Sequence, residues 1–157
     1  MNFKRCLPAL LVCGLLALTA TLIKSALAGA IKTPTDPKAA VRKVLDDQVI
    51  AWNKGDLVGF MAGYWESDDL RFYSGKEVTS GWKATLERYR KRYTAEGKKM
   101  GKLSFSDLEI EILGPDAALV RGRFLVELPD EKASGLFTLI MRKLPVGWRI
   151  VHDHTSG

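Results

Sequence analysis

The two histidines of the chain, His152 and His154, stand on either side of Asp153 near the C-terminus. Imidazole and carboxylate groups are common metal ligands and common proton carriers in proteins. A His-x-His pair can chelate zinc or iron when further ligands converge on it. Residues 29–157 contain no further histidine and no cysteine, so carboxylates or water are the only other ligands that this segment offers. The composition favours a structural histidine pair, and we expect no metal and no cofactor.

The stretch that contains these histidines, GWRIVHDHTSG (residues 147–157), has the pattern of a final β-strand. Successive side chains of a strand point to opposite faces of the sheet, so strict alternation divides the stretch in two. One face carries Trp148, Ile150, His152 and His154, and the other carries Arg149, Val151, Asp153 and Thr155. Whichever face meets the protein interior therefore decides which of these groups can act on a bound molecule.

Helical segments precede the strands and must help to position them. A first helix begins at an N-cap, Thr35 or Asp36, with Pro37 in its first turn. The apolar face of this helix ends at residues 53–55. Asp56 can cap a shorter second helix, and a third helix begins near Trp82. The apolar faces at helical spacing consist of Val41, Val44, Leu45, Gln48, Val49 and Trp52, of Leu57, Phe60, Met61 and Tyr64, and of Trp82, Thr85, Leu86, Tyr89 and Tyr93.

The remaining segments read as strands. Residues 70–81 form a short ribbon, and four runs with a period of two follow at residues 102–114, 117–128, 133–144 and 147–155. Short turns between these runs predict an antiparallel meander. The apolar parity slips between Phe105 and Leu108, which predicts a β-bulge near Ser106-Asp107. The fold class is therefore α+β, with helices on one face of a curved sheet that encloses a cone-shaped pocket.

The order of these motifs resembles the SnoaL-like and nuclear transport factor 2-like superfamily over about residues 38–157. The resemblance rests on AWNKGDLVGFM (51–61), on the Gly75…Gly81-Trp82 turn and on the terminal Trp-x-Ile-Val-His-x-His-x-Ser-Gly stretch. Within the superfamily the chain is most similar to the branch that includes the association domain of calcium/calmodulin-dependent kinase II. The resemblance implies three helices wrapped by a strongly curved sheet, usually dimerised through the outer sheet face. The superfamily contains both enzymes and non-catalytic domains, so it names no reaction.

The resemblance also implies which face of each strand points into the pocket. The kinase association domain carries a pocket-facing arginine at the position of Thr155, which places Asp153 and Thr155 inward and both histidines outward. A second cavity arginine matches Arg121, and strand parity adds Arg123 to the same face. This places Val120, Gly122, Phe124 and Val126 on the opposite face.

An Arg121–Asp153 pair at the base of the cone follows from these assignments. One interpretation is a buried salt bridge that fixes the sheet. The other is a site in which Arg121 holds a carboxylate or enolate oxygen while Asp153 shuttles a proton. The aromatic residues expected to turn inward, as core or as ligand contacts, are Trp52, Tyr64, Phe72, Trp82 and Tyr89. Glu109 and Glu111 are expected on a solvated face.

The first residues have the organisation of a secretory signal peptide. MNFKR gives a positive start, residues 6–23 an apolar core, and Ala26-Leu27-Ala28 a small-x-small cleavage pattern. We expect a signal peptide at 1–28, a leader at 29–37 and the domain at 38–157. An uncleaved anchor and lipoprotein processing at Cys13 are less favoured alternatives. Cleavage removes Cys6 and Cys13, lowers the net charge from +6 to +3, and implies a secreted or periplasmic domain without disulfides.

These observations together predict an exported domain that binds a small molecule or supports assembly. The alternative is a cofactor-free isomerase, dehydratase or hydrolase that uses Asp153 as a proton shuttle. We expect a small apolar or carboxylate-bearing ligand and a homodimer or larger ring. No membrane contact is expected after cleavage. The basic stretch RYRKRY (88–93) contains tyrosines at helical spacing, so we interpret it as a solvated helix face and expect no nucleic acid partner.

Overall fold

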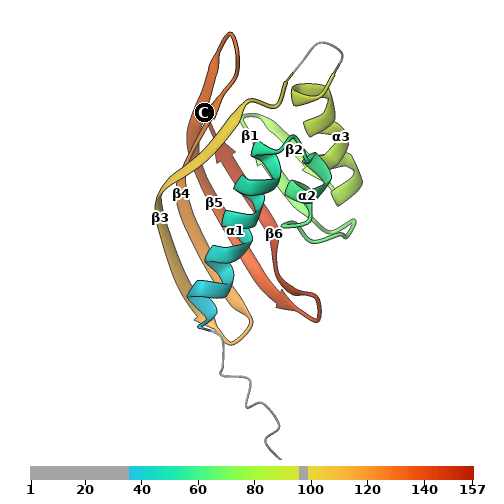
Figure 1. Cartoon of the computed structure of the whole chain (residues 1–157). Helices are drawn as coiled ribbons and strands as arrows, with labels where there is room; N and C mark the ends of the chain where they lie inside the picture. The colour runs from blue at the N-terminus through green and yellow to red at the C-terminus, as the bar shows by residue number, and fades with distance from the viewer. Residues whose placement is uncertain (1–35, 96–98) are drawn as a thin grey trace, which may run out of the picture. The chain divides into compact units, whose positions relative to one another are not determined.

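The computed structural model describes residues 36–95 and 99–157, which belong to the compact unit Thr35–Gly157. In the order of the chain, this part forms α1 (Pro37–Asn53), α2 (Leu57–Met61), β1 (Arg71–Ser74), β2 (Glu77–Ser80), α3 (Trp82–Tyr93), β3 (Lys102–Gly114), β4 (Ala117–Glu127), β5 (Lys132–Leu144) and β6 (Gly147–Ser156). The helices lie on one side of the sheet, with α1 running along it (Figure 1). The predicted α+β class and the three helices are confirmed.

The six strands form one sheet in the order β2-β1-β6-β5-β4-β3. Neighbouring strands from β3 to β6 are antiparallel, which confirms the predicted meander. The ribbon at residues 70–81 is the hairpin of β1 and β2, and β1 joins the sheet parallel to β6. This parallel pairing brings residues from the middle of the chain beside the terminal strand, where Phe72 lies opposite Asp153.

Both predicted helix starts have side-chain caps. Asp36 is the N-cap of α1, with Pro37 at the first position, and its Oδ1 accepts a hydrogen bond from the Lys38 N–H at 3.0 Å. Asp56 caps α2 by accepting from the Gly59 N–H at 2.8 Å. Between the two helices Gly55 has φ +76°, a left-handed conformation that glycine adopts without strain. Local chemistry thus fixes the bend between α1 and α2.

Trp52 occupies the centre of the hydrophobic core. Its ring makes edge contacts with Phe60, Tyr89 and Tyr93, with centroids at 5.0, 6.1 and 4.7 Å. The indole N–H donates to the Met100 carbonyl oxygen at 3.0 Å, so its polar atom is satisfied despite burial. One side chain therefore joins all three helices to the segment that leads into β3.

Two of the three register shifts in the sheet affect the direction of side chains near the site. The first lies between Ser106 and Glu109, with Asp107 at φ 52°, and confirms the predicted bulge. The second lies in β6, where His152 and Ile150 pair with the consecutive residues Ile140 and Met141 of β5. Val151 is the extra residue of this second bulge.

The bulge at Val151 corrects the strict alternation predicted for β6. Because the extra residue resets the parity, Trp148, Ile150 and Asp153 are all buried on the helix side of the sheet. His154 is exposed on the other side, as the sequence predicted, and His152 is partly exposed. The terminal strand thus contributes both its apolar residues and its carboxyl group to the interior.

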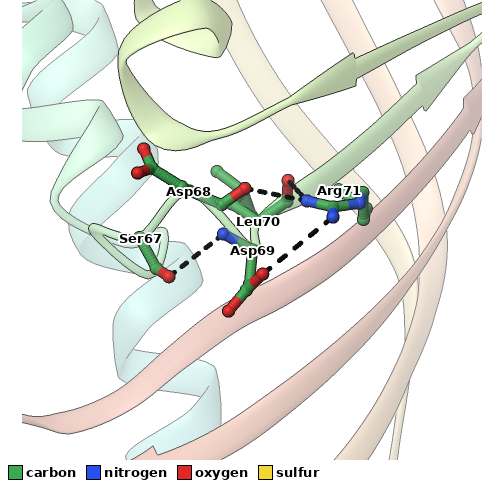
Figure 2. Close-up of polar contacts among 5 residues, drawn as sticks. All are labelled: Ser67, Asp68, Asp69, Leu70 and Arg71. Carbon is green, nitrogen blue, oxygen red and sulfur yellow. Dashed lines mark hydrogen bonds and ion pairs between the residues drawn. The ribbon is translucent and has the colours of Figure 1, made fainter.

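The loop between α2 and β1 is held by its own polar groups (Figure 2). The Asp69 N–H donates to Ser67 Oγ at 3.1 Å, and Arg71 Nη1 donates to the carbonyl oxygens of Asp68 and Leu70 at 2.8 and 3.1 Å. The Leu70 side chain between these groups is fully buried. These contacts fix the point at which β1 enters the sheet and, with it, the position of Phe72.

The predicted signal peptide, residues 1–28, and nearly all of the predicted leader, residues 29–37, lie outside the described residues. Asp36 and Pro37 are described, and they already form the start of α1. None of the helices in residues 36–95 and 99–157 has the length and apolar character needed to cross a membrane.

Candidate functional site

A cavity of about 1180 Å³ lies between the concave side of the sheet and the helices. Its walls combine polar and charged residues with a set of aromatic ones that includes Trp52, Phe60, Phe72, Phe105, Phe124 and Phe137. The exposed residues of its lining, which mark its mouth, lie on α3, on the β1–β2 hairpin and around the turn that joins β4 to β5. Ligand sites are usually concave and combine apolar walls with convergent polar groups, and this cavity offers both kinds of group.

Asp153 is the polar group at the base of the cavity, and only 3% of its surface is exposed. Its Oδ2 accepts a hydrogen bond from the Tyr64 hydroxyl at 2.7 Å, and its Oδ1 accepts one from Thr155 Oγ1 at 2.7 Å. The Tyr89 hydroxyl interacts in turn with that of Tyr64. All four side chains line the cavity, so they form a connected polar group inside apolar walls.

Burial dominates the electrostatics of this group. It raises the pKa of Asp153 from 3.8 to about 6, while the hydrogen bonds from Thr155 and Tyr64 and the charge of His154 act in the opposite direction. Burial, together with the negative charge of Asp153, raises the pKa of both Tyr64 and Tyr89. At neutral pH the carboxyl group is thus mainly ionised, and both phenols remain hydrogen-bond donors.

Residues far apart in the chain are brought to the base by backbone pairing. The Trp65 N–H donates to the Ile150 carbonyl oxygen at 2.9 Å, and Tyr64 and Ile150 form an isolated parallel bridge. This bridge places the Tyr64 hydroxyl within reach of Asp153, which the bulge at Val151 has turned inward. The sequence predicted that both side chains face the interior, but not that they contact each other.

The structure contradicts the predicted positions of Arg121 and Arg123, which lie on the outer face of the sheet. Arg121 forms ion pairs with Glu109 at 3.3 Å and Glu111 at 3.1 Å, and Arg123 pairs with Asp107 at 3.1 Å. An Arg121–Asp153 pair therefore does not form, and neither arginine lines the cavity. The expectation that Glu109 and Glu111 occupy a solvated face is confirmed.

Hydrophobic burial explains why these arginines point outward. The side chains that face the helices come from the alternate residues of β4, which are Ala118, Val120, Gly122, Phe124 and Val126. If β4 were turned over, these apolar side chains would be exposed and two guanidinium groups would be buried. Burying each guanidinium group costs roughly several kcal/mol unless the group is well paired. The local apolar pattern of the strand therefore outweighs the position implied by the resemblance.

Most of the predicted wall residues do line the cavity. Trp52, Tyr64, Phe72, Tyr89 and Thr155 all contribute to its surface.

Trp82 is the exception among the predicted wall residues. Its indole N–H donates to the Met61 carbonyl oxygen at 2.9 Å, which ties the start of α3 to α2. Its role in this structure is packing between helices.

Arg88 of α3 is a cavity residue that the sequence interpretation missed. The sequence predicts a solvated helix face at this position. The Arg88 side chain is nevertheless only 30% exposed, and its guanidinium carbon lies 5.5 Å from the centroid of the Phe72 ring. Arg92, one helical turn later, also lines the cavity. Both residues directly precede the tyrosines of the buried stripe, Tyr89 and Tyr93, and this spacing is the signal that could have revealed them.

The two histidines lie on the outer face of the sheet against Tyr73. The ring centroids of His152 and His154 are 5.0 and 5.9 Å from that of Tyr73. Partial burial and the nearby His154 lower the pKa of His152. Within residues 36–95 and 99–157, no group of three or more histidine, cysteine, aspartate and glutamate residues is arranged to hold a metal ion.

The curved sheet, the three helices and the enclosed pocket define the class of the protein as nuclear transport factor 2-like. Residues 41–157 match the family model described as the SnoaL-like domain, and the chain belongs to this family. The predicted superfamily is thereby confirmed, and the kinase association-domain branch remains a prediction. A search among proteins of curated function finds no match.

Solved structures show the same fold. An NTF-2 like protein of unknown function from Shewanella oneidensis MR-1 is 35% identical, covers 77% of this chain and 99% of its own, and has a TM-score of 0.72. A nuclear transport factor 2-like superfamily protein from Salmonella enterica serovar Typhimurium LT2 is 22% identical, with coverages of 77% and 90% and a TM-score of 0.64. A ketosteroid isomerase-like protein from Erwinia carotovora atroseptica SCRI1043 is 18% identical, with coverages of 78% and 96% and a TM-score of 0.60.

Proposed function

We propose that this domain binds a small, largely apolar molecule that carries a hydrogen-bonding oxygen. The observation that carries the proposal is Asp153, a buried carboxyl group at the base of a cavity of about 1180 Å³. The aromatic walls suit an apolar body, and the group of Asp153, Tyr64 and Tyr89 suits one oxygen function. No cofactor is required for binding of this kind.

The arrangement at the base supports binding better than a purely structural role. A buried carboxylate loses solvation, and an apolar side chain of similar volume generally stabilises a core at least as well. Within the described residues, the carboxylate accepts its side-chain hydrogen bonds from hydroxyl groups, those of Tyr64 and Thr155, and from no cationic group. A hydroxyl group of a ligand supplies a further donor to Asp153, and a carbonyl group can accept from Tyr89.

Paired probes can test this proposal. We expect 2-naphthol to bind the wild-type protein about tenfold more tightly than naphthalene near neutral pH, because a hydrogen bond to a charged acceptor is worth about 1.5–3 kcal/mol. Tryptophan fluorescence titration measures both affinities. Asp153→Asn should abolish most of the difference, whereas Asp107→Asn, which changes a carboxylate on the outer face, should preserve it. Equal affinities of the two probes for the wild type contradict the proposal.

Catalysis is a second candidate function, favoured by the pKa of Asp153. A general base works best when its pKa lies near the operating pH, and burial brings this carboxyl group to about 6. The corresponding reaction is a cofactor-free isomerisation, dehydration or hydrolysis with Asp153 as the proton shuttle. The Asp153→Asn variant distinguishes catalysis from binding alone. If this variant turns over any substrate of the wild type at full rate, Asp153 is not the proton shuttle and the second function is excluded.

The outer face of the sheet is the proposed surface for a homodimer or larger ring. Leu136 and Ile140 of β5 are 50% and 40% exposed there. Tyr73 and His154 flank them across β1 and β6, so apolar and aromatic groups share this face. Interfaces of stable homodimers are enriched in such groups.

A charge placed in this surface should disrupt the assembly. We expect the wild-type protein to elute as a dimer or larger assembly. Leu136→Lys should raise the dissociation constant of this assembly by about tenfold or more, because the lysine loses its solvation at the interface. Light scattering after size exclusion measures the mass. Val58→Lys, an equally exposed position on α2, should have no effect. A monomeric wild type, or a dimeric Leu136→Lys protein, contradicts the assignment.

We also propose export, with residues 1–28 removed as a signal peptide and the domain acting in the periplasm or outside the cell. The support for this proposal is the order of charged, apolar and small residues in the sequence. A domain without cysteines after residue 28 is compatible with an oxidising compartment. Mass spectrometry of protein purified from its host should give the mass of a subunit whose first residue is Gly29.

A further inference from the structure

We propose that the ligand is an amphiphilic acid: its oxygen function meets Asp153 at the base of the cavity, and its acidic group is held at the mouth by Arg88. This inference rests on the proposed binding function and names its ligand class. The acid group is of the carboxylate type, on an apolar or aromatic body about the length of the cavity. Arg88 thereby takes the role that the family resemblance implied for Arg121.

The order of side chains along the cavity wall supports two separate polar ends. Phe72 of β1 and Asp153 of β6 are direct neighbours across the parallel strands, and both side chains line the cavity. The guanidinium group of Arg88 lies over the Phe72 ring, 5.5 Å from its centroid. Phe72 therefore neighbours Asp153 across the strands and contacts Arg88 of α3 through its ring.

The guanidinium group retains capacity for an incoming anion. Its hydrogen bonds to described residues both leave from Nη1, one to Glu77 Oε2 and one to Thr79 Oγ1 at 3.4 Å. A guanidinium group carries five N–H donors in a rigid fork, which suits a carboxylate with two oxygens. Because Glu77 is itself largely exposed, its pairing with Arg88 contributes little and can be rearranged at small cost.

The charge around the mouth also favours an acid. Four basic side chains line this end of the cavity, against three carboxylates: Arg88, Lys91, Arg92 and Lys132, and Glu77, Glu87 and Glu131. Arg92 of α3 pairs with Glu131 of the β4–β5 turn at 3.2 Å, so the basic groups come from both sides of the opening. Arg88, Arg92 and Lys132 each pair with an exposed carboxylate, and because exposed pairs contribute little, an incoming acid can compete for these basic groups.

The base of the cavity has the opposite preference. Asp153 is ionised at neutral pH, and a second carboxylate beside it is repelled by the like charge in a poorly solvated site. The acidic end of a ligand is therefore excluded from the base, while a hydroxyl or carbonyl oxygen is accepted there. The two ends of the cavity together fix one orientation of an amphiphilic acid.

A matched pair of probes tests this inference: 6-hydroxy-2-naphthoic acid and its methyl ester, titrated by fluorescence at neutral pH and low salt. We expect the wild-type protein to bind the acid about tenfold more tightly than the ester, the usual order for one charge-assisted bidentate contact. Arg88→Met should remove this preference and leave the affinity for the ester within about threefold. Arg88→Lys keeps the charge without the planar fork and should keep part of the preference.

Arg42→Met is the matched control, because Arg42 lies on the exposed side of α1, pairs with Asp46 at 2.9 Å, and neither of these two residues lines the cavity. It should bind both probes as the wild type does, and circular dichroism should show that all variants are folded. Equal binding of acid and ester by the wild type, or an acid preference that survives Arg88→Met, overturns the inference while pocket binding stands. If the wild type binds neither these probes nor 2-naphthol, the proposed function fails as well.

Discussion

Lowering the pH from about 7.5 to about 4 should stabilise the wild-type protein, relative to its Asp153→Asn variant, by about 2 kcal/mol. The pKa of Asp153 is raised in the folded protein from 3.8 to about 6, mainly by burial. The folded state therefore binds this proton more tightly than the unfolded state does. Below pH 3.8 the carboxyl group is mainly protonated in both states, so folding buries no charge. The free-energy cost of burying the charge grows as the pH rises from 3.8 and is fully present above about 6.

Urea unfolding of both proteins at a series of pH values measures this effect. The free energy of unfolding of the wild type minus that of Asp153→Asn should fall as the pH rises through this window and then stay constant. Taking the difference cancels the acid effects of the exposed carboxylates, which the two proteins share. Asp107→Asn, at an exposed position, should give a nearly flat difference. A difference that rises with pH shows that the ionised form of Asp153 is favoured in the folded state, contrary to the structure.

Replacing Trp52 by alanine should lower the free energy of unfolding by about 3–5 kcal/mol. The indole is almost fully buried, packs edge-on against Phe60, Tyr89 and Tyr93, and donates a hydrogen bond to Met100. Alanine leaves a void among these rings and an unsatisfied carbonyl oxygen. Because small domains are stable by roughly 5–15 kcal/mol, this loss brings the protein close to unfolding at ambient temperature.

Chemical denaturation of the purified variant measures the loss. Ile50→Ala, at a 52% exposed position on the same helix, controls for the general effect of alanine and should change stability by less than about 0.5 kcal/mol. Trp52→Phe retains part of the aromatic packing and should fall between the two. A loss below about 1 kcal/mol for Trp52→Ala means that the core repacks around the void.

The two faces of the sheet present different side chains and have different proposed roles. The inner face holds Asp153 and Phe72 against the helices and forms the cavity. The outer face carries His154 and Tyr73 beside the exposed Leu136 and provides the proposed interface. Substitutions on the inner face should therefore change ligand affinity, and those on the outer face should change assembly.

Features set by neighbouring residues could be predicted from the sequence. Asp36 and Asp56 cap helices because each accepts from an N–H within the next few residues. The bulge near Asp107 showed as a slip in the apolar pattern, since burial demands one parity on each side of it. The inward position of Asp153 was also predicted correctly, although from the family resemblance and not from alternation.

Features that depend on pairing between distant segments could not be predicted in this way. The bulge at Val151 has no signal in β6 itself, because it arises from how β6 pairs with β5. The contact of Tyr64 with Asp153 requires the parallel pairing of β1 with β6 and the bridge at Ile150. Neither partner strand can be recognised from the terminal stretch alone.

The basic side chain of the cavity shows the same division. The family resemblance placed Arg121 inward, and the structure shows it outward because Val120 and Phe124 on the alternate positions are buried. The helical spacing of Tyr89 and Tyr93 predicted the apolar stripe of α3, and Arg88 directly precedes the first of these tyrosines. Only the tertiary structure decided that Arg88 meets Phe72 at the mouth of the cavity, because helix periodicity fixes the face of a side chain but not what packs against it.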